Sequence, residues 1–253
     1  MLIVSDVHGA FSELARVASR GEPLLVLGDL LNFVDYRTGR GIAADVYGRE
    51  YALEFIRNRK TGDWPANRRL WRRVQEGRAP ELAERIRTAV RRQYRAARRA
   101  LLPAEKAYVI HGNVDWPEEM ASALSGAAAL VDGEVVEIEG YSIGFAGGGV
   151  PTPARARGEV SHEAMAAKLD ALGRVDILCT HVAPSVAPLR RDVVTGMLER
   201  SSSEVLDYLV SHQPLYHYFG DIHQPQAHAW RVGRTVCRNV GYFRATARAV
   251  RHG

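Results

Sequence analysis

Short apolar runs that end in polar residues recur along this chain. Five of them have the length and the leucine, β-branched or aromatic content of buried strands. These runs are residues 2–4, 24–27, 108–110, 177–179 and 216–219. Segments with helical spacing lie between them, and the first is residues 11–18, where apolar side chains recur every third or fourth position. Strands that alternate with helices predict an α/β protein.

The pattern after residue 130 adds a hairpin, a helix and a closing strand. Residues 135–138 and 141–145 are two strand-like runs, and Glu139-Gly140 between them suits a tight turn. Ser201, followed three residues later by Glu204, resembles a capping box that opens a helix. Residues 234–241 then predict a closing strand.

The connection between Asp29 and Gly112 is too long for a loop, and helical spacing fills it. The helical stripes are residues 47–56, 70–74 and 80–103. The longest of these stripes has a proline at each end, as expected of a helix bounded by proline. We therefore predict a single domain, residues 1–253, that carries a helical insertion at residues 37–103.

Residues that are able to bind metal ions follow directly after all five strand-like runs. They are Asp6, His8, Asp29, Asn113, His181, Asp221 and His223. Strand ends of an α/β sheet are where such folds place their sites, so we expect these loops to converge. Carboxylate, imidazole and amide donors without a thiolate suit Mn²⁺, Fe²⁺ or Fe³⁺, Mg²⁺ or Zn²⁺.

Seven candidate ligands are more than one catalytic ion with open positions needs. They fit two divalent ions, about 3.5–4 Å apart, that share one carboxylate and lower the pKa of a shared water. Such a pair clamps a phosphoryl group. A phosphoester is therefore the expected substrate, and two metal ions are the expected cofactors, with manganese preferred to iron, zinc or magnesium.

Taken together, the clusters resemble the calcineurin-like metallophosphoesterase superfamily. Its pattern reads D-x-H, G-D, G-N-H-[DE], H and G-H-x-H in this order, and the resemblance spans residues 2–223. Each short motif alone recurs by chance, whereas five in order, each after a strand, are specific. The resemblance implies a four-layer αββα sandwich, with Asp29 and Asn113 as the catalytic residues. It also implies that Asp29 bridges two ions, the first held by Asp6, His8 and His223 and the second by Asn113 and His181.

The first departure from that pattern removes a general acid. The family's G-N-H-[DE] histidine is Val114 here, and the carboxylate that commonly orients it is replaced by Asn32. General acid assistance is typically worth about 10²–10⁴-fold in rate. Its loss predicts slower chemistry or substrates with good leaving groups, and a phosphodiesterase in preference to an efficient monoesterase.

The second departure is Asp221, which stands where the family has the first histidine of G-H-x-H. A third carboxylate beside Asp6 and Asp29 would add a hard oxygen ligand to the second site and shift its preference from Zn²⁺ toward Mn²⁺ or Mg²⁺. The alternative is that this shorter side chain acts through a water and leaves the ion weakly bound. We expect direct ligation.

Two further residues have an open role. Asp115 suits either an N-cap for a helix that begins at Trp116-Pro117 or an outer position behind the metal ligands. Arg155, in the glycine-rich stretch 147–157, could pair with a substrate phosphate or could be a solvated surface residue. The remaining histidines have no motif context, and we expect them to be ordinary residues.

The predicted insertion differs from the rest of the chain in charge. Between Phe33 and Pro103 there are 18 Arg or Lys against 8 Asp or Glu, an excess of +10, whereas the whole chain is only +5. A basic helical face beside a phosphoesterase site could attract a nucleotide or, as the less favoured case, nucleic acid. The arginine count leaves two other interpretations open. The basic faces of these helices could simply be solvated, or the insertion could pack against a partner subunit in a homo-oligomer.

Length and composition agree with a cytoplasmic enzyme. A chain of 253 residues buries a full core. It begins with a strand-like run and contains no run of about 18 apolar residues, so neither a signal peptide nor a membrane span is expected. Cys179 and Cys237 lie in apolar runs and are expected to be buried free thiols, although one disulfide between them stays open.

The sequence thus predicts a binuclear metal-dependent phosphohydrolase, in the first place a phosphodiesterase that uses a metal-bridging hydroxide. A non-catalytic scaffold, with a structural metal site and a protein-binding insertion, is the rival from another class. The six unaltered ligands count against this rival, because a retired site has no need of an open binuclear geometry. A nuclease is a third interpretation, and it rests on the arginine count alone.

Overall fold

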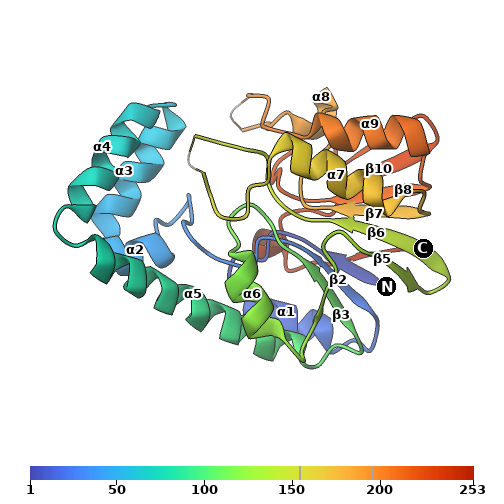
Figure 1. Ribbon diagram of the computed structural model, residues 1–253, viewed down its shortest axis with the longest axis horizontal. Coiled ribbons are helices and arrows are strands. Elements are labelled where there is room, and N and C mark those ends of the chain that lie inside the picture. Colours follow the sequence, from blue (N-terminus) through green and yellow to red (C-terminus); the bar gives the residue numbers. More distant parts are fainter. Residues whose placement is uncertain (154, 195) are drawn as a thin grey trace.

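Two mixed β-sheets form the centre of the computed structural model, which describes residues 1–153, 155–194 and 196–253 (Figure 1). The first sheet has the strand order β11-β1-β2-β3-β4. Its parallel strands are β1 (Leu2–Val4), β2 (Leu24–Leu27), β3 (Ala107–Ile110) and β4 (Ala129–Leu130). β11 (Val250–Arg251) runs antiparallel to β1, so segments from opposite ends of the described chain lie side by side.

The second sheet has the strand order β5-β6-β7-β8-β10-β9. Its parallel strands are β6 (Tyr141–Ala146), β7 (Ile177–Thr180), β8 (Tyr216–Phe219) and β10 (Thr235–Asn239). The antiparallel edge strands are β5 (Val135–Ile138) and β9 (Ala229–Val232). Parallel strands are buried on both faces and read as continuous apolar runs, which is why the sequence pattern located most of them.

Alternate side chains of the strands enter different apolar clusters, because successive residues of a strand point to opposite faces. Ile3 of β1 and Leu25 of β2 share a buried cluster with Phe145 of β6 and Ile177 of β7. Val4 of β1 belongs instead to a cluster that also contains helical residues. The two sheets therefore face each other across a shared apolar core.

Helices cover the other face of each sheet (Figure 1). The first sheet packs against α1 (Phe11–Ala18), α5 (Ala79–Leu101) and α6 (Pro117–Leu124). The second sheet packs against α7 (His162–Leu172), α8 (Ala187–Arg190) and α9 (Ser203–His212). The short α10 (Phe243–Thr246) adds Phe243 to the cluster of the first sheet. The prediction of an α/β fold is confirmed.

Three helices project from one end of the molecule (Figure 1). These projecting helices are α2 (Ile42–Tyr47), α3 (Arg49–Lys60) and α4 (Trp64–Gln75). A small apolar cluster around Ala43, Tyr51 and Leu70 holds them together. α5 belongs to the cluster of the first sheet, where Val90 and Tyr94 are fully buried, and α2 reaches the same cluster through Ile42. Residues 37–103 therefore consist of a projecting part, which α2 joins to the main core, and a helix that belongs to that core.

Most predicted elements are present, with small shifts at their ends. The β5–β6 hairpin turns at Glu139 and Gly140, whose φ angles are 51° and 82°. The expected cap at Ser201 is wrong, because the helix begins one residue later than the capping-box spacing predicts. Ser202 is the N-cap residue of α9, and its hydroxyl accepts from the backbone N–H of Val205.

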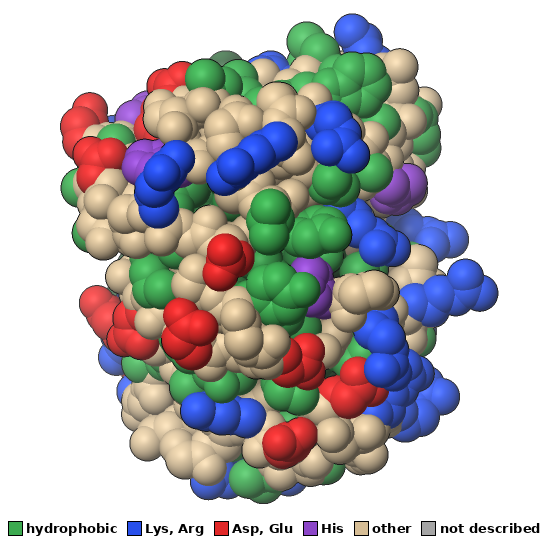
Figure 2. Space-filling view, turned by 90° about the vertical axis from the view of Figure 1, so that its right-hand side faces the viewer, with side chains coloured by type: hydrophobic (Ala, Val, Ile, Leu, Met, Phe, Trp, Pro, Cys, Tyr) green, Lys and Arg blue, Asp and Glu red, His purple; other side chains and the backbone are tan. Residues whose placement is uncertain are grey.

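The face turned away from the projecting helices carries acidic, basic and apolar side chains interspersed (Figure 2). Cys179 and Cys237 are buried and free, as expected. Among the residues that the structure describes, no helix is both long enough and apolar enough to cross a membrane.

Candidate metal centre

The candidate ligands lie in five loops, and each loop directly follows a parallel strand. The loops after β1, β2 and β3 belong to the first sheet, and those after β7 and β8 belong to the second. Hydrogen bonds connect loops of the two sheets at this edge. The backbone N–H of Asp221 donates to Asp6 Oδ2 at 3.0 Å, and His181 Nδ1 lies 2.7 Å from Leu27 O.

Asp6, His8 and His223 form one group of donor atoms. His223 Nε2 lies 3.3 Å and His8 Nε2 lies 3.8 Å from the same oxygen, Oδ1 of Asp6. One ligand atom from each residue falls within 4.8 Å of the other two. Two ligands that bind one ion at about 2.1 Å with tetrahedral angles are about 3.4 Å apart, so this spacing fits a metal ion.

Asp29 directs its two carboxylate oxygens to different histidines. Oδ2 lies 3.5 Å from His8 Nε2, and Oδ1 lies 3.5 Å from His181 Nε2. Asp29, His181 and Asp6 form a second group of donor atoms within 4.8 Å of one another. A carboxylate placed in this way is able to bridge two ions.

Asn113 and Asp221 complete the side of the centre that contains His181. Asn113 Oδ1 is 3.3 Å from His181 Nε2, and Asp221 Oδ1 is 3.8 Å from the same nitrogen. The Asp221 carboxylate is thus close enough to share an ion with His181. Its distance from His181 Nε2 is among the longest between donor atoms in the cluster. The structure brings all seven predicted ligands together.

Two of the histidines present a nitrogen lone pair to the cluster. His8 Nδ1 lies 2.9 Å from Leu31 O, and His181 Nδ1 lies 2.7 Å from Leu27 O. Because a carbonyl only accepts, we assign a proton to each Nδ1, so Nε2 is the atom that each ring offers as a lone pair once the ring is neutral. His8 Nε2 is buried and has no hydrogen-bond partner among the described residues. A metal ion would satisfy such a nitrogen, with the carbonyl orienting the ring.

Glycine precedes several of the ligands because a side chain there would collide with the cluster. A Cβ atom at Gly112 would overlap Oδ1 of Asp29, and a Cβ atom at Gly220 would overlap Ser5 and the Asp6 carboxylate. The recurring Gly-Asp and Gly-Asn pairs are therefore a packing requirement that lets the loops approach one another.

Four of the ligands have a left-handed backbone conformation. The φ angles are 57° at Asp6, 41° at His8, 54° at Asp29 and 66° at Asp221. Residues other than glycine rarely adopt such angles, and they do so where the surrounding structure holds them. Here the backbone N–H of His8 donates to Asp29 O at 2.8 Å. The ligand loops are thus fixed by bonds to one another.

The buried carboxylates give the centre a strong negative potential. Burial raises the pKa of Asp29 to about 8, and the charges of Asp115 and Asp6 add to this rise. Burial would lower the pKa of His181, but the charges of Asp29, Asp221 and Asp6 outweigh it and raise that pKa to about 9. A divalent cation would displace both protons and compensate the negative charge, so the donor set fits a metal ion.

Asp115 ties the ligand loops to α5, so of the two roles left open for it the N-cap role is wrong and the position behind the candidate ligands is correct. Its buried carboxylate accepts from the backbone N–H of Leu30 at 3.2 Å and of Gly112 at 2.9 Å, and from the Tyr94 hydroxyl at 3.1 Å. The N-cap residue of α6 is Trp116. The loops after β2 and β3 take the Asp115 carboxylate as a shared acceptor, so it lies behind the ligands instead of at a helix end.

Tyr242 and Arg244 also belong to the centre, although the motifs did not predict them. The Tyr242 ring stacks on that of His223, with centroids 3.8 Å apart and an interplanar angle of 2°. Arg244 donates to His8 O and, at 2.7 Å, to Asp35 Oδ2. Both residues follow the closing strand β10, and this position after a strand was the feature of the sequence that could have indicated them. Neither residue type is a usual metal ligand, and the metal motifs therefore passed over them.

Val114 and Asn32 offer no side-chain acid to the centre. The Val114 side chain packs against the apolar cluster of the first sheet, and its backbone N–H donates to Asp29 Oδ1 at 3.0 Å. The backbone N–H of Asn32 donates to Gln93 of α5 at 2.8 Å. The two positions are therefore used for packing and for backbone anchoring.

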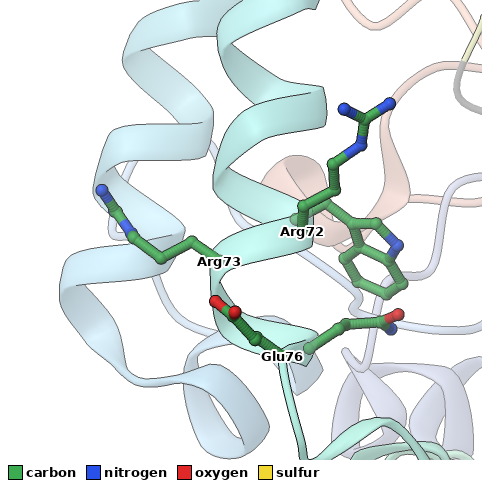
Figure 3. A pocket seen from close by; sticks show the side chains of 5 residues that line it. Arg72, Arg73 and Glu76 are labelled. Carbon is green, nitrogen blue, oxygen red and sulfur yellow. The ribbon is translucent and has the colours of Figure 1, made fainter.

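Arg155 is exposed and has a left-handed φ of 50°. Its neighbour Arg157 is engaged elsewhere, with its guanidinium carbon 3.9 Å from the ring centroid of Trp116. A separate hollow on α4 is lined by Trp71, Arg72, Arg73, Gln75 and Glu76 (Figure 3). Arg72 and Arg73 point in different directions there, so their charges do not converge on one ligand.

Comparison with known proteins identifies only the fold. No protein-family model and no curated protein matches the chain. One solved structure has a TM-score of 0.61 at 15% identity, and the match covers 96% of this chain and 90% of that chain. The crystal structure of TT1561 of Thermus thermophilus has a TM-score of 0.53 at 13% identity, covering 98% of this chain and 96% of that chain. At these identities the likeness extends to the fold alone.

Proposed function

We propose that this protein is a binuclear metal-dependent phosphohydrolase that acts as a phosphodiesterase. In this proposal the two facing sheets and their covering helices are the four-layer αββα sandwich of the calcineurin-like metallophosphoesterases. The projecting helices and α5 are a helical insertion, and the projecting part forms a cap at one end of the molecule. The proposed compartment is the cytoplasm, in keeping with two free thiols.

The observation that carries this proposal is the position of Asp29 between two histidines. Each of its oxygens lies 3.5 Å from a different Nε2, one of His8 and one of His181. Both Nδ1 atoms face backbone carbonyls, so both Nε2 atoms are available as ligands. Such an arrangement suits two ions, and its oxygen and imidazole donors suit manganese, iron, zinc or magnesium.

Two ions held there would supply Lewis acidity and a water of lowered pKa. The contribution of the protein is to fix the donors. Asp29 sets the separation of the two sides, and the backbone N–H of Val114 orients its Oδ1. The Asn113 amide turns its Oδ1 toward His181, which leaves its NH₂ group to donate to a phosphoryl oxygen.

A diester suits the centre better than a monoester for two reasons. Val114 and Asn32 have no proton to give, so the leaving group must depart without general acid assistance. The centre also contains three carboxylates, those of Asp6, Asp29 and Asp221. A diester carries one negative charge and meets less repulsion from them than the dianion of a monoester does.

Metal analysis of the purified protein, followed by hydrolysis assays, tests the proposal. We expect about two divalent ions per chain, and faster hydrolysis of bis-p-nitrophenyl phosphate than of p-nitrophenyl phosphate with added Mn²⁺. A scaffold with a structural metal site would bind metal and hydrolyse neither ester. Failure of hydrolysis with Mn²⁺, Fe²⁺, Zn²⁺ and Mg²⁺ in turn would therefore favour the scaffold and contradict the enzyme.

A further inference from the structure

Tyr36 lies at the rim of the candidate centre with an exposed ring. It belongs to the loop that leads from β2 and Asp29 to the projecting helices. Its neighbour Asp35 binds Arg244 at 2.7 Å, and Arg244 also donates to the backbone carbonyl of His8. Tyr36 nevertheless keeps 39% of its surface exposed. The loop that carries this ring is therefore tied through Asp35 and Arg244 to the backbone of His8, and the ring remains available for contact.

Arg59 of α3 lies over that ring. Its guanidinium carbon is 5.1 Å from the ring centroid of Tyr36 and 5.8 Å from that of Trp64. Contacts of this kind restrain a side chain that is otherwise mobile. Among the described residues Arg59 forms no ion pair with a carboxylate, whereas Arg73 of α4 is paired with Glu54 at 2.8 Å. Arg59 is thus a restrained cation with unused donors.

Charges from three parts of the molecule reach the Tyr36 hydroxyl. The buried part of the Tyr36 side chain raises its pKa, the charge of Arg59 opposes this rise, and the charges of Asp29 and Glu199 add to it. Glu199 lies in the segment after α8, on the main body of the molecule. Burial and the charge of Asp6 raise the pKa of Asp221, and the charge of Glu199 adds to this rise. Arg59 is the cation in this set, while the metal ligands and Glu199 contribute negative charge.

We propose that Arg59, supported by Tyr36, binds a second anionic group of the substrate beside the scissile phosphoester. This inference rests on the proposed phosphohydrolase function. A guanidinium group recognises carboxylate and phosphate groups through paired hydrogen bonds. The carboxylates of the centre and Glu199 disfavour a further negative charge elsewhere, so Arg59 determines where that charge is placed. Preferred substrates are phosphoesters that carry an additional carboxylate or phosphate substituent.

Three synthetic esters with one leaving group test the inference. They are the mono-4-nitrophenyl esters of methylphosphonate, of phosphonoacetate and of methylenediphosphonate. The first has a single negative charge, the second adds a carboxylate and the third adds a second phosphonate. The ratio of kcat/KM for each multiply charged ester to that for the methylphosphonate ester measures the contribution of the second anionic group.

Arg59→Gln should lower at least one of these ratios about tenfold or more, mainly through KM, because a hydrogen bond to a charged group is lost. The ester whose ratio falls further identifies the preferred anion. Arg59→Lys should retain part of the preference. Arg57→Gln is the matched control, since Arg57 is exposed on the same helix and about 200° away around its axis. The control should leave both ratios unchanged.

Equal ratios in the wild type and in Arg59→Gln would overturn the inference. If the wild type hydrolyses none of the three esters with Mn²⁺, Fe²⁺, Zn²⁺ or Mg²⁺, the proposed function has failed and the inference is judged by binding. Calorimetry would then compare phosphonoacetate, methylenediphosphonate and methylphosphonate with the Mn²⁺-treated wild type and the same variants. A preference for a multiply charged ligand that Arg59→Gln abolishes supports the anion site, and equal binding of all three ligands overturns it.

Discussion

The two sides of the candidate centre share Asp29 but differ in their remaining donors. The first side consists of Asp6, His8 and His223, and the second side consists of His181, Asn113 and Asp221. The first side offers two imidazoles and a carboxylate, whereas the second offers one imidazole, an amide oxygen and a carboxylate. The difference teaches that one carboxylate can lie between two unlike donor sets, and it predicts unequal affinities for two ions.

The two sides are also supported differently. On the first side an aromatic ring, that of Tyr242, stacks on His223. On the second side a buried hydrogen-bond network holds the loops, with Asp115 accepting from Gly112 and from Tyr94 of α5. Asp115 and Tyr94 thus contact the second side directly through Gly112, whereas they reach the first side through Leu31, whose backbone N–H donates to Asp115 and whose carbonyl orients His8. Substitutions should separate the two sides, unless the shared bridge is removed.

Removal of the bridge should have the largest effect. Asp29→Asn should abolish binding of at least one ion and lower kcat/KM by more than about 1000-fold. This follows because even residues that only support metal ligands are worth about 10–100-fold. The fold should survive, since burial of this carboxylate raises its pKa and so costs stability when it is charged. Metal content, circular dichroism and hydrolysis of bis-p-nitrophenyl phosphate measure these outcomes.

Asp207→Asn is the control for that substitution, because Asp207 is exposed on α9 and lies outside the ligand set. It should leave metal content and turnover unchanged. Wild-type turnover in Asp29→Asn would remove the basis for two bridged ions, and the comparison of two sides would lose its meaning.

The absence of an acid on the second side should appear as a dependence on the leaving group. Val114 and Asn32 supply no proton, so rates should fall steeply as the leaving group becomes more basic. We expect methyl p-nitrophenyl phosphate to be hydrolysed at least about 100-fold faster than dimethyl phosphate, in line with the usual worth of general acid assistance. Initial rates across a series of substituted phenyl esters measure the slope. A flat series would mean that another residue acts as the acid.

The sequence predicted which residues gather on both sides because each signal was local. A buried parallel strand is a continuous apolar run, and the residue directly after it lies at the edge where sites form. Gly112 and Gly220 strengthened this signal, since each glycine is required by contact with a neighbouring ligand loop. Local pattern and global packing agree at these positions, and the prediction of their convergence was therefore correct.

The supporting residues were not predictable in the same way, because their roles depend on contacts between distant segments. Asp115 is adjacent to a helix start in sequence, yet its carboxylate is used by Leu30 and Tyr94. Tyr242 follows the closing strand, but tyrosine is not a usual metal ligand. Its contact is with the ring of His223, in the loop after β8. The sequence correctly predicted α5 as a helix. It could not predict that α5 belongs to the main core, because this depends on packing against α1 and α6.

The identity of residue 221 should tune the second side alone. If the Asp221 carboxylate ligates, one of its oxygens should lie about 2.0–2.3 Å from the second ion in a crystal structure. Asp221→Ala should then weaken that ion about tenfold or more, as loss of a supporting ligand does, and spare the ion of the first side. Asp221→His should raise affinity for Zn²⁺ relative to Mn²⁺. A structure with both ions bound and Asp221 turned away would contradict direct ligation.

Removal of metal should make stability depend on pH in a defined window. Burial raises the pKa of Asp29 to about 8, and neighbouring carboxylates raise that of His181 to about 9 against the effect of its burial. Unfolded Asp and His residues lose their protons near about pH 3.9 and 6.5. Above about pH 6.5, where His8 with its lowered pKa is neutral in both states, the folded state holds more protons at Asp29 and His181. The free energy of unfolding should therefore fall as pH rises from about 6.5 to 9. Urea unfolding in the presence of a chelator measures this slope.

The same pKa values should give the two ions different pH dependences, which is the mildest test of the comparison. Burial and the charge of His223 lower the pKa of His8 to about 4, so an ion on the first side displaces no proton from it near neutral pH. An ion on the second side must displace the proton of His181. Its affinity should therefore rise about tenfold per pH unit up to about pH 9. The affinity of the first ion should instead follow Asp29, up to about pH 8, and His223, whose pKa the hydrogen bond to Asp6 raises against the effect of burial. Titration calorimetry in buffers of different ionisation enthalpy counts the protons released by each ion, and a second ion with flat affinity from pH 7 to 9 would exclude His181 as its ligand.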